Sequence, residues 1–273
     1  MPGLLATDLD GTLLPLQSSK YRDDHRDCLR LLCRLASAKE LAIVFVTGRH
    51  LASILEAMNE QQLPTPECII CDVGSSIYVR ENDSYQLVEE YSDHLAMAAG
   101  GIDTVALERL LQDLCQQNDR FELRKQEDAK QGRFKLSYYC SGKYLNDATE
   151  VLQSILTAQD LSFGIVSSLD PFVGGGLIDL MPLGTNKANA VRWWCNRQAI
   201  ETGRIVFSGD SGNDLAALTA DFRAIVVGNA SKSLIEDVRR HHEEAGTMNR
   251  VFFASKEATA GVVQGCRHFG LIQ

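Results

Sequence analysis

Residues 4–14 read Leu-Leu-Ala-Thr-Asp-Leu-Asp-Gly-Thr-Leu-Leu, an apolar run that stops at two carboxylates, Asp8 and Asp10, followed at once by a glycine. The run predicts a buried strand whose end the glycine marks. In an open α/β sheet, ligands bind at the carboxyl ends of the strands. Paired carboxylates there can hold a divalent cation, attack an electrophile or move a proton. The alternative for this segment alone is a strand followed by a solvated acidic turn.

The alternation of strand and helix patterns continues from this first strand. Apolar runs at residues 41–46 and 68–71 predict two more buried strands, and residues 24–38 and 50–61 carry apolar side chains at helical spacing. A strand-helix-strand-helix-strand order of this kind predicts a parallel sheet with right-handed crossovers. We therefore expect an α/β fold with a Rossmann-like parallel-sheet core.

The pattern changes near residue 75, which indicates an insert in this core. A polar turn at residues 81–84 predicts a hairpin, and the segments after it mix short strands and helices without the regular alternation. Apolar strands return at residues 177–181, 205–208 and 224–227. We expect a core built from residues 1–78 and 172–273 and a smaller α+β insert at residues 79–171.

Composition narrows the classes of function. The chain has 273 residues, 45% of them hydrophobic, and a formal net charge of −9. This is ordinary globular composition, and the acidic balance disfavours nucleic acids and anionic membranes as partners. No apolar run reaches the length of a membrane span, and no secretory signal precedes the first strand. We expect a cytoplasmic protein whose eight scattered cysteines stay reduced.

Polar residues follow four of the predicted core elements, and a parallel sheet would bring them to one edge. Besides Asp8 and Asp10, these are Thr47-Gly48-Arg49, Gly184-Thr185-Asn186-Lys187 and Gly209-Asp210-Ser211-Gly212-Asn213-Asp214. This set suits phosphoryl transfer. One carboxylate can attack phosphorus, and a second can donate and accept the proton. Mg²⁺ can neutralise the clustered acids, and a lysine, a hydroxyl and backbone N–H groups can hold phosphoryl oxygens.

The same four segments resemble, in order, the four motifs of haloacid dehalogenase-type phosphatases with an α/β-type cap. The residues within these motifs resemble those of sucrose-phosphate phosphatases and related glycosyl-phosphate phosphatases in particular. The matching segments are residues 73–75, 134–139, 179–182, 186–187, 209–214 and 227–230. Ala188, Ser76 and the longer segment 170–176 depart from that pattern and leave the identity of the sugar open.

The resemblance implies roles for individual residues. Asp8 would be the nucleophile and a Mg²⁺ ligand, and Asp10 would be the general acid and base with its backbone carbonyl on the metal. Asp210 would be a ligand of the Mg²⁺, and Asp214 would bind the metal or orient its water. Phosphate-binding roles would belong to Thr47, Gly48, Lys187 and Asn213. The insert would be a cap that sets substrate specificity. Sugar contacts are expected from Ser75, Lys135, Ser137, Tyr139, Thr185, Asn186 and Asn229.

Several of these residues have simpler interpretations. Lys187 could be a surface lysine at a helix start, and the polar side chains of residues 135–139 could be the wet side of a sheet. Arg49 could pair with an acid on the surface, so we leave it out of the catalytic set. The acidic neighbours of His241 and His242 indicate a solvated helix end rather than a metal site.

Together these features predict Mg²⁺-dependent hydrolysis of a sugar phosphate, such as sucrose 6-phosphate or a similar glycosyl phosphate, through an aspartyl-phosphate intermediate. A phosphohexomutase of the same superfamily is an alternative enzyme. A non-catalytic partner that binds a sugar phosphate or a sugar-phosphate synthase is an alternative of another class, although such a protein is expected to lose one of the acids.

Overall fold

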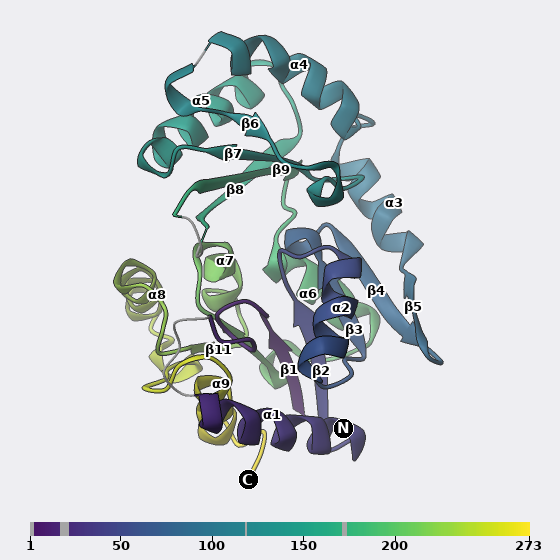
Figure 1. Ribbon diagram of the computed structural model, residues 1–273, viewed down its shortest axis with the longest axis vertical. Coiled ribbons are helices and arrows are strands. Elements are labelled where there is room, and N and C mark those ends of the chain that lie inside the picture. The colour runs from purple at the N-terminus through teal and green to yellow at the C-terminus, as the bar shows by residue number, and fades with distance from the viewer. Residues whose placement is uncertain (1–2, 17–21, 118, 171–173) are drawn as a thin grey trace. The chain divides into compact units, whose positions relative to one another are not determined.

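The computed structural model describes residues 3–16, 22–117, 119–170 and 174–273 (Figure 1). The chain divides into two compact units. Unit 1 comprises Met1–Leu87 and Lys187–Gln273, and unit 2 comprises Val88–Asn186. Unit 2 is therefore inserted in the sequence of unit 1. The expected boundary between residues 171 and 172, and part of the segment 170–176, lie outside the described residues.

Unit 1 contains an eight-stranded sheet in the order β12-β11-β10-β1-β2-β3-β4-β5. Its first six strands in this order are parallel, while β4 and β5 extend one edge as an antiparallel hairpin. This confirms the predicted parallel core. The strands are β1 (Gly3–Thr7), β2 (Leu41–Val46), β3 (Cys68–Cys71), β4 (Ser76–Glu81), β5 (Ser84–Leu87), β10 (Ile205–Gly209), β11 (Arg223–Val226) and β12 (Val251–Phe253).

Helices cover both faces of this sheet, which explains why its central strands are apolar throughout. On one face, Leu5 and Phe45 are buried in a cluster with residues of α1, α2 and α9. On the other face α6 contacts β3, and α6 and α7 contact each other. The helices of unit 1 are α1 (Arg22–Ser37), α2 (Leu51–Gln61), α6 (Lys187–Arg197), α7 (Leu215–Leu218), α8 (Lys232–Glu244) and α9 (Ala258–His268).

Unit 2 is an α+β structure built on a four-stranded antiparallel sheet in the order β6-β7-β9-β8. Leu152 and Leu156 of α5 pack on Phe163, Ile178 and Leu180 of the sheet and form a separate apolar core. Its elements are α3 (Glu89–Ala98), α4 (Thr104–Gln117), β6 (Arg124–Lys125), β7 (Leu136–Cys140), α5 (Leu145–Ala158), β8 (Phe163–Leu169) and β9 (Gly176–Pro182).

The predicted hairpin and the predicted strand at residues 177–181 both exist, but each belongs to the sheet of the other unit from the one expected. The expected hairpin exists as β4 and β5, but it extends the sheet of unit 1 through the pairing of β3 with β4. The strand expected to resume the core at residues 177–181 is β9, which pairs with β7 and β8 in unit 2. Periodicity identifies a strand but not its pairing partner, because partners are chosen by tertiary packing.

Single turns of 3₁₀ helix connect several of these elements. They are η1 (Asp72–Gly74), η2 (Asp119–Phe121), η3 (Asp128–Lys130), η4 (Gly142–Tyr144), η5 (Thr202–Arg204), η6 (Gly212–Asp214) and η7 (Met248–Arg250). No helix within the described part of the chain is both long and apolar enough to pass through a membrane.

Candidate active site

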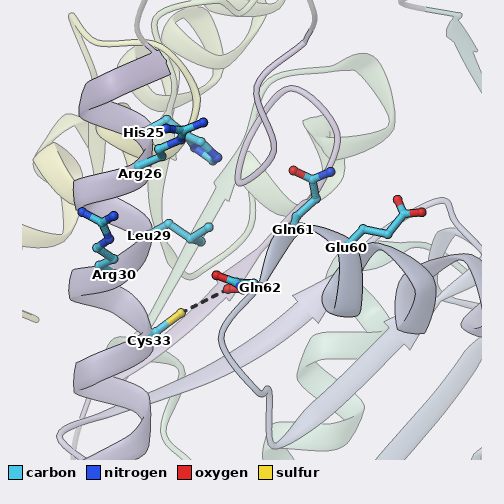
Figure 2. A pocket seen from close by; sticks show the side chains of 8 residues that line it. All are labelled: His25, Arg26, Leu29, Arg30, Cys33, Glu60, Gln61 and Gln62. Carbon is cyan, nitrogen blue, oxygen red and sulfur yellow. Dashed lines mark hydrogen bonds between the residues drawn. The ribbon is translucent and has the colours of Figure 1, made fainter.

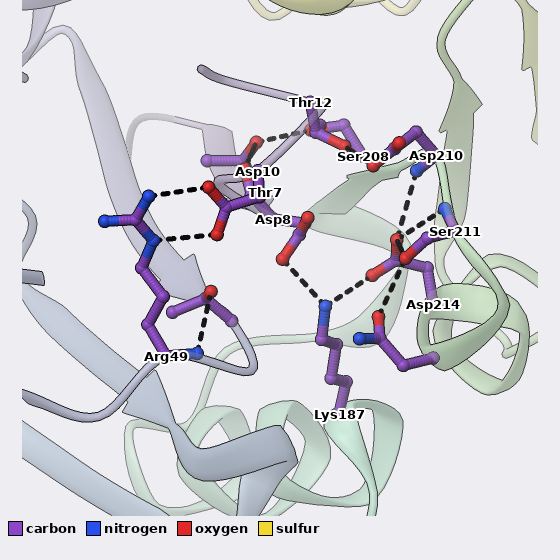
Figure 3. Close-up of polar contacts among 12 residues, drawn as sticks. Thr7, Asp8, Asp10, Thr12, Arg49, Lys187, Ser208, Asp210, Ser211 and Asp214 are labelled. Carbon is purple, nitrogen blue, oxygen red and sulfur yellow. Dashed lines mark hydrogen bonds and ion pairs between the residues drawn. The ribbon is translucent and has the colours of Figure 1, made fainter. Parts of the chain in front are cut away.

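The carboxyl ends of β1, β2 and β10 bring three of the polar segments together in unit 1. In the sheet β1 lies between β10 and β2, so the loops that follow these strands are neighbours. Asp8 and Asp10 follow β1, Thr47 and Arg49 follow β2, and Asp210 follows β10. Lys187, the first residue of α6, points at the acids of this edge (Figure 3).

Lys187 is the centre of the cluster. Its Nζ donates to Asp8 Oδ1 at 2.8 Å and to Asp214 Oδ1 at 2.7 Å. The side chains of Lys187 and Asp214 are 0% exposed and that of Asp8 is 6% exposed, which excludes the surface-lysine alternative. Burial alone lowers the pKa of Lys187, but the carboxylates of Asp214 and Asp8 outweigh it and hold that pKa above its ordinary value. Lys187 is therefore a buried, charged ammonium group.

Three carboxylates, from Asp8, Asp210 and Asp214, each place one oxygen within 4.8 Å of the other two. Burial raises the pKa of Asp8 well above its usual value, against the attraction of Lys187 and with further repulsion from Asp214 and Asp210. Burial and the charge of Asp214 raise the pKa of Asp210 to about 7. These shifts indicate that Lys187 alone does not balance the negative charge. Oxygen donors at this spacing fit a hard divalent cation.

The loop after β10 holds Asp214 in place from both sides. Asp214 Oδ2 accepts hydrogen bonds from the backbone N–H groups of Asp210 and Ser211, both at 3.0 Å, and from Ser211 Oγ at 3.2 Å. A Cβ added at Gly209 would lie 2.6 Å from Asp214 Cβ and Cγ, so a side chain at this position would displace the carboxylate. The Gly209-Asp210 sequence is thus a steric requirement of the site.

A second glycine fits the turn after β1 against Asp210. Gly11 has φ +79°, and a Cβ there would lie 2.2 Å from Asp210 Oδ2. Thr12 Oγ1 donates to Asp210 Oδ1 at 2.8 Å. Asn229 Nδ2 donates to Gly11 O at 2.8 Å, and Asn229 Oδ1 accepts from Ala258 N–H at 2.8 Å. Asn229, expected to contact sugar, therefore braces the turn that carries Asp10 and Gly11.

Asp10 is held by Arg49, a residue that the sequence interpretation left out. The Arg49 Nε donates to Asp10 Oδ2 and its Nη2 to Asp10 Oδ1, both at 2.7 Å. Thr47 is buried, and its Oγ1 accepts from the Arg49 backbone N–H at 3.2 Å. The missing signal was spatial, because a Thr-Gly-Arg sequence does not say which acid faces the arginine.

Gly48, Asn213 and Ser75 lie around the same edge. A Cβ added at Gly48 would lie 3.7 Å from Asn213 Nδ2, which places these two residues beside each other. Asn213 Oδ1 accepts from Ser211 Oγ at 3.1 Å. Ser75 is buried and its Oγ donates to Asp72 O at 2.9 Å, so its hydroxyl closes the turn after β3.

The other predicted sugar contacts belong to unit 2. Ser137 is fully buried, and its Oγ donates to Asp179 Oδ1, so it does not lie on a wet sheet face. Tyr139 donates to Glu127 Oε2 at 2.9 Å and accepts from Lys130 Nζ at 2.6 Å. The remaining three are Lys135 and Thr185, which are buried, and Asn186, which is half-buried.

The prediction that His241 and His242 lie at a solvated helix end holds for only one of the two residues. His241 is exposed, whereas His242 is 1% exposed. The ring Nε2 of His242 donates to Leu218 O at 2.9 Å, and its Nδ1 faces Thr247 Oγ1 at 2.8 Å. The solvated assignment of His242 was wrong because two polar partners compensate for its burial.

A groove of about 670 Å³ lies between α1 and the end of α2, and it contains none of the predicted site residues (Figure 2). Arg26 and His25 extend from α1 on one side, and Gln61 and Gln62 line the other. Its cationic side chains are largely exposed, and no buried polar group points into it among those that line it. The acidic cluster at the strand ends therefore remains the candidate site.

Comparison with known proteins agrees with this geometry. A family model described as Sucrose-6F-phosphate phosphohydrolase matches residues 1–270. A putative haloacid dehalogenase-like hydrolase of Nitrosococcus oceani is 34% identical over 97% of this chain and 71% of its own length. A mannosylfructose-phosphate phosphatase of Agrobacterium fabrum is 30% identical over 98% of this chain and 97% of its own.

Other relatives are longer than this chain. A glucosylglycerol-phosphate synthase of Pseudomonas anguilliseptica is 28% identical over 98% of the chain, which spans 31% of that protein.

A solved structure shows the same fold. The sucrose-phosphatase of a Synechocystis species, determined in complex with sucrose and phosphate, superposes with a TM-score of 0.74 at 24% identity, covering 98% of each chain. The fold, the order of the motifs and the family match agree, and they confirm the resemblance seen in the sequence. The chain belongs to the sucrose-6F-phosphate phosphohydrolase family of haloacid dehalogenase-like phosphatases.

Proposed function

We propose that this chain hydrolyses a sugar phosphate in two steps, with Asp8 as the nucleophile. The observation that carries the proposal is the buried contact of Asp8 Oδ1 with Lys187 beside Asp210 and Asp214. This contact fixes one oxygen of Asp8, and Oδ2 accepts no hydrogen bond from the described residues. A carboxylate oriented in this way has one oxygen left for attack on phosphorus.

The two steps balance with the residues at hand. In the first, Asp8 Oδ2 bonds to phosphorus, the bond from phosphorus to the sugar oxygen breaks, and Asp10 gives that oxygen a proton. In the second, Asp10 takes a proton from a water molecule whose oxygen attacks the phosphorus, and Asp8 leaves as a carboxylate with inorganic phosphate. Lys187, Thr47, Gly48 and Asn213 are the proposed phosphoryl-binding groups.

A divalent cation, which we propose to be Mg²⁺, fits the oxygen donors of Asp8 and Asp210 and the backbone carbonyl of Asp10. When bound, it would neutralise the clustered charge and polarise the phosphoryl group. Asp214 has Oδ1 engaged by Lys187 and Oδ2 by two backbone N–H groups. We therefore expect Asp214 to contribute mainly through its charge and by orienting its neighbours.

The substrate class follows from the relatives and from the inserted unit. The named relatives act on mannosylfructose phosphate and on sucrose phosphate, so we propose a glycosyl phosphate such as sucrose 6-phosphate. Unit 1 would be the catalytic core, and unit 2 would be the cap that selects the sugar. The match within a glucosylglycerol-phosphate synthase supports a sugar-phosphate synthase as a partner that supplies the substrate.

The test is phosphate release from a panel of sugar phosphates with and without Mg²⁺. The panel contains sucrose 6-phosphate, glucosylglycerate phosphate, mannosylglycerate phosphate, trehalose 6-phosphate and simple hexose phosphates. We expect turnover that requires the metal and that Asp8→Asn abolishes. Asp221→Asn, which breaks an ion pair with Arg192 away from the site, is the matched control. Unchanged turnover in Asp8→Asn would refute the nucleophile.

The competing functions give different readouts in the same assay. A phosphohexomutase would yield an isomerised sugar phosphate without free phosphate. A binding module would retain a sugar phosphate, or a sugar-phosphate synthase in a pull-down, without turnover.

A further inference from the structure

Arg49 lies between two residues of the proposed reaction and contacts both of them. Its guanidinium binds Asp10, and its backbone N–H binds Thr47 Oγ1. Building on the proposed function, we propose that Arg49 is a positioning residue: it holds the carboxyl group of Asp10 in the orientation in which Asp10, when protonated, gives its proton to the leaving sugar oxygen.

The geometry of the pair is specific. Nε and Nη2 of one planar guanidinium reach the two different oxygens of Asp10, both at 2.7 Å, and Figure 3 shows the two groups facing each other. A two-point contact fixes both the position and the rotation of a carboxylate, which a single contact does not. The side chains are 29% and 28% exposed, so the pair adds little to stability and its effect is chiefly geometric.

Arg49 is itself fixed by the turn after β3. Asp72 N–H donates to Arg49 O at 3.0 Å, and Val73 N–H donates to Thr47 O at 3.1 Å. Asp72 and Val73 have φ of 52° and 59°, in the left-handed region that a β-branched residue such as Val73 rarely adopts. Such strain persists only where the surrounding structure imposes it. The turn therefore clamps the backbone from Thr47 to Arg49.

The side chain is also anchored at its far end. Arg49 Nη1 donates to Ser53 O and Ser53 Oγ, both at 3.4 Å, at the start of α2. These contacts leave Nε and Nη2 directed at Asp10. In the contact with the Arg49 backbone N–H, Thr47 Oγ1 is the acceptor and uses only a lone pair. The hydroxyl hydrogen of Thr47 therefore stays available to donate to a phosphoryl oxygen. One residue thus orients the acid and the phosphate-binding hydroxyl together.

The consequence is a loss of rate that depends on the leaving group. An alkyl phosphate needs a proton on its departing oxygen, whereas 4-nitrophenyl phosphate releases a stabilised anion and needs little help from an acid. Replacing Arg49 should slow the first reaction much more than the second. A purely structural role would slow both reactions equally.

The experiment measures single-turnover phosphoryl transfer with enzyme in excess, using 4-nitrophenyl phosphate and the member of the panel that the wild-type chain cleaves fastest. Arg49→Ala is expected to slow transfer from the sugar phosphate by about 10- to 100-fold, which is only part of the roughly 10²- to 10⁴-fold that general acid catalysis supplies, because Asp10 itself remains in place. Transfer from 4-nitrophenyl phosphate should slow by less than about threefold, because its leaving group needs little help from a general acid. Arg49→Lys should recover part of the loss, because it restores the charge and one contact.

The controls separate this role from folding and from the proposed function itself. Arg192→Ala removes a half-exposed arginine-aspartate pair outside the site and should leave both rates unchanged. Urea unfolding checks each variant, and Arg49→Gln replaces Arg49→Ala if the latter does not fold. Equal losses on both substrates, or no loss on either, overturn the positioning role while phosphatase activity stands. A wild-type chain that releases no phosphate refutes the proposed function, and the role of Arg49 with it.

Discussion

Replacing Lys187 by methionine removes the buried cation that Asp8 and Asp214 share. Lys187 and Asp214 are fully buried and Asp8 nearly so, so water cannot replace the lost contacts at 2.8 Å and 2.7 Å. Breaking a buried ion pair in this way costs about 3–5 kcal/mol, because an uncompensated charge remains inside. Two carboxylates lose their partner here, so we expect a loss near the upper end of that range.

The assay is urea unfolding followed by tryptophan fluorescence. Both tryptophans of the chain, Trp193 and Trp194, lie on α6 in the same unit as Lys187 and report on its unfolding. The control is Lys256→Met, which removes an exposed pair with Asp24, at 3.1 Å and about half accessible on both sides. Surface pairs of this kind contribute about 0–1 kcal/mol.

The deficit of Lys187→Met should depend on pH with a definite sign. Without the ammonium group, Asp8 loses the attraction that opposes the effect of burial, so its folded pKa lies still further above the unfolded value of about 3.9. Ionisation of such a buried acid disfavours the folded state, so the deficit grows as the pH rises through that folded pKa. We expect a larger loss at pH 7 than at pH 5, and a smaller difference when Mg²⁺ is added. A loss no greater than that of Lys256→Met would refute this account of the site.

Three further changes test other parts of the structure. Gly11→Ala should lower the free energy of unfolding by at least about 1–2 kcal/mol because of the left-handed backbone at this position, and the clash with Asp210 should also reduce phosphate release. Gly203→Ala has open space around its Cβ and should change neither urea unfolding nor activity. EDTA should lower the thermal midpoint of the wild-type chain but not that of Asp210→Asn, and equal shifts in both would exclude Asp210 as a metal ligand. His242→Ala leaves the buried carbonyl of Leu218 and the half-buried hydroxyl of Thr247 without their ring partner, and it should cost about 1–3 kcal/mol in urea unfolding. The exposed His241→Ala should cost almost nothing, and similar losses in the two variants would contradict the buried role of His242.

The core sheet and the acidic edge could be predicted because they depend on local sequence. Fully apolar runs identify β1, β2 and β3 as doubly covered strands, and in a parallel sheet their polar ends must meet at one edge. The position of β9 could not be predicted, because its pattern fits either sheet and only pairing with β7 and β8 decides between them.

Single contacts across the site were equally hidden from the sequence. Arg49 was set aside because nothing in the local sequence distinguishes an arginine that binds both oxygens of Asp10 from an arginine on the surface. His242 was assigned to solvent because its neighbours are charged, although its ring faces Leu218 and Thr247. In both cases the hydrogen-bond partners of the side chain decide its environment, and these partners are not its immediate neighbours in the sequence.

The pairing of β1 with β10 has a consequence for how the chain acquires its structure during synthesis. Leu4 pairs with Ile205, so the central strand lacks one neighbour until the chain has been made as far as residue 205 of the 273. Unit 2 is contiguous and can complete its sheet earlier, and ordering it shortens the loop that β1 and β10 must close. Until then the apolar edge of β1 is open to wrong partners, so we expect aggregation of nascent or truncated chains that end before β10.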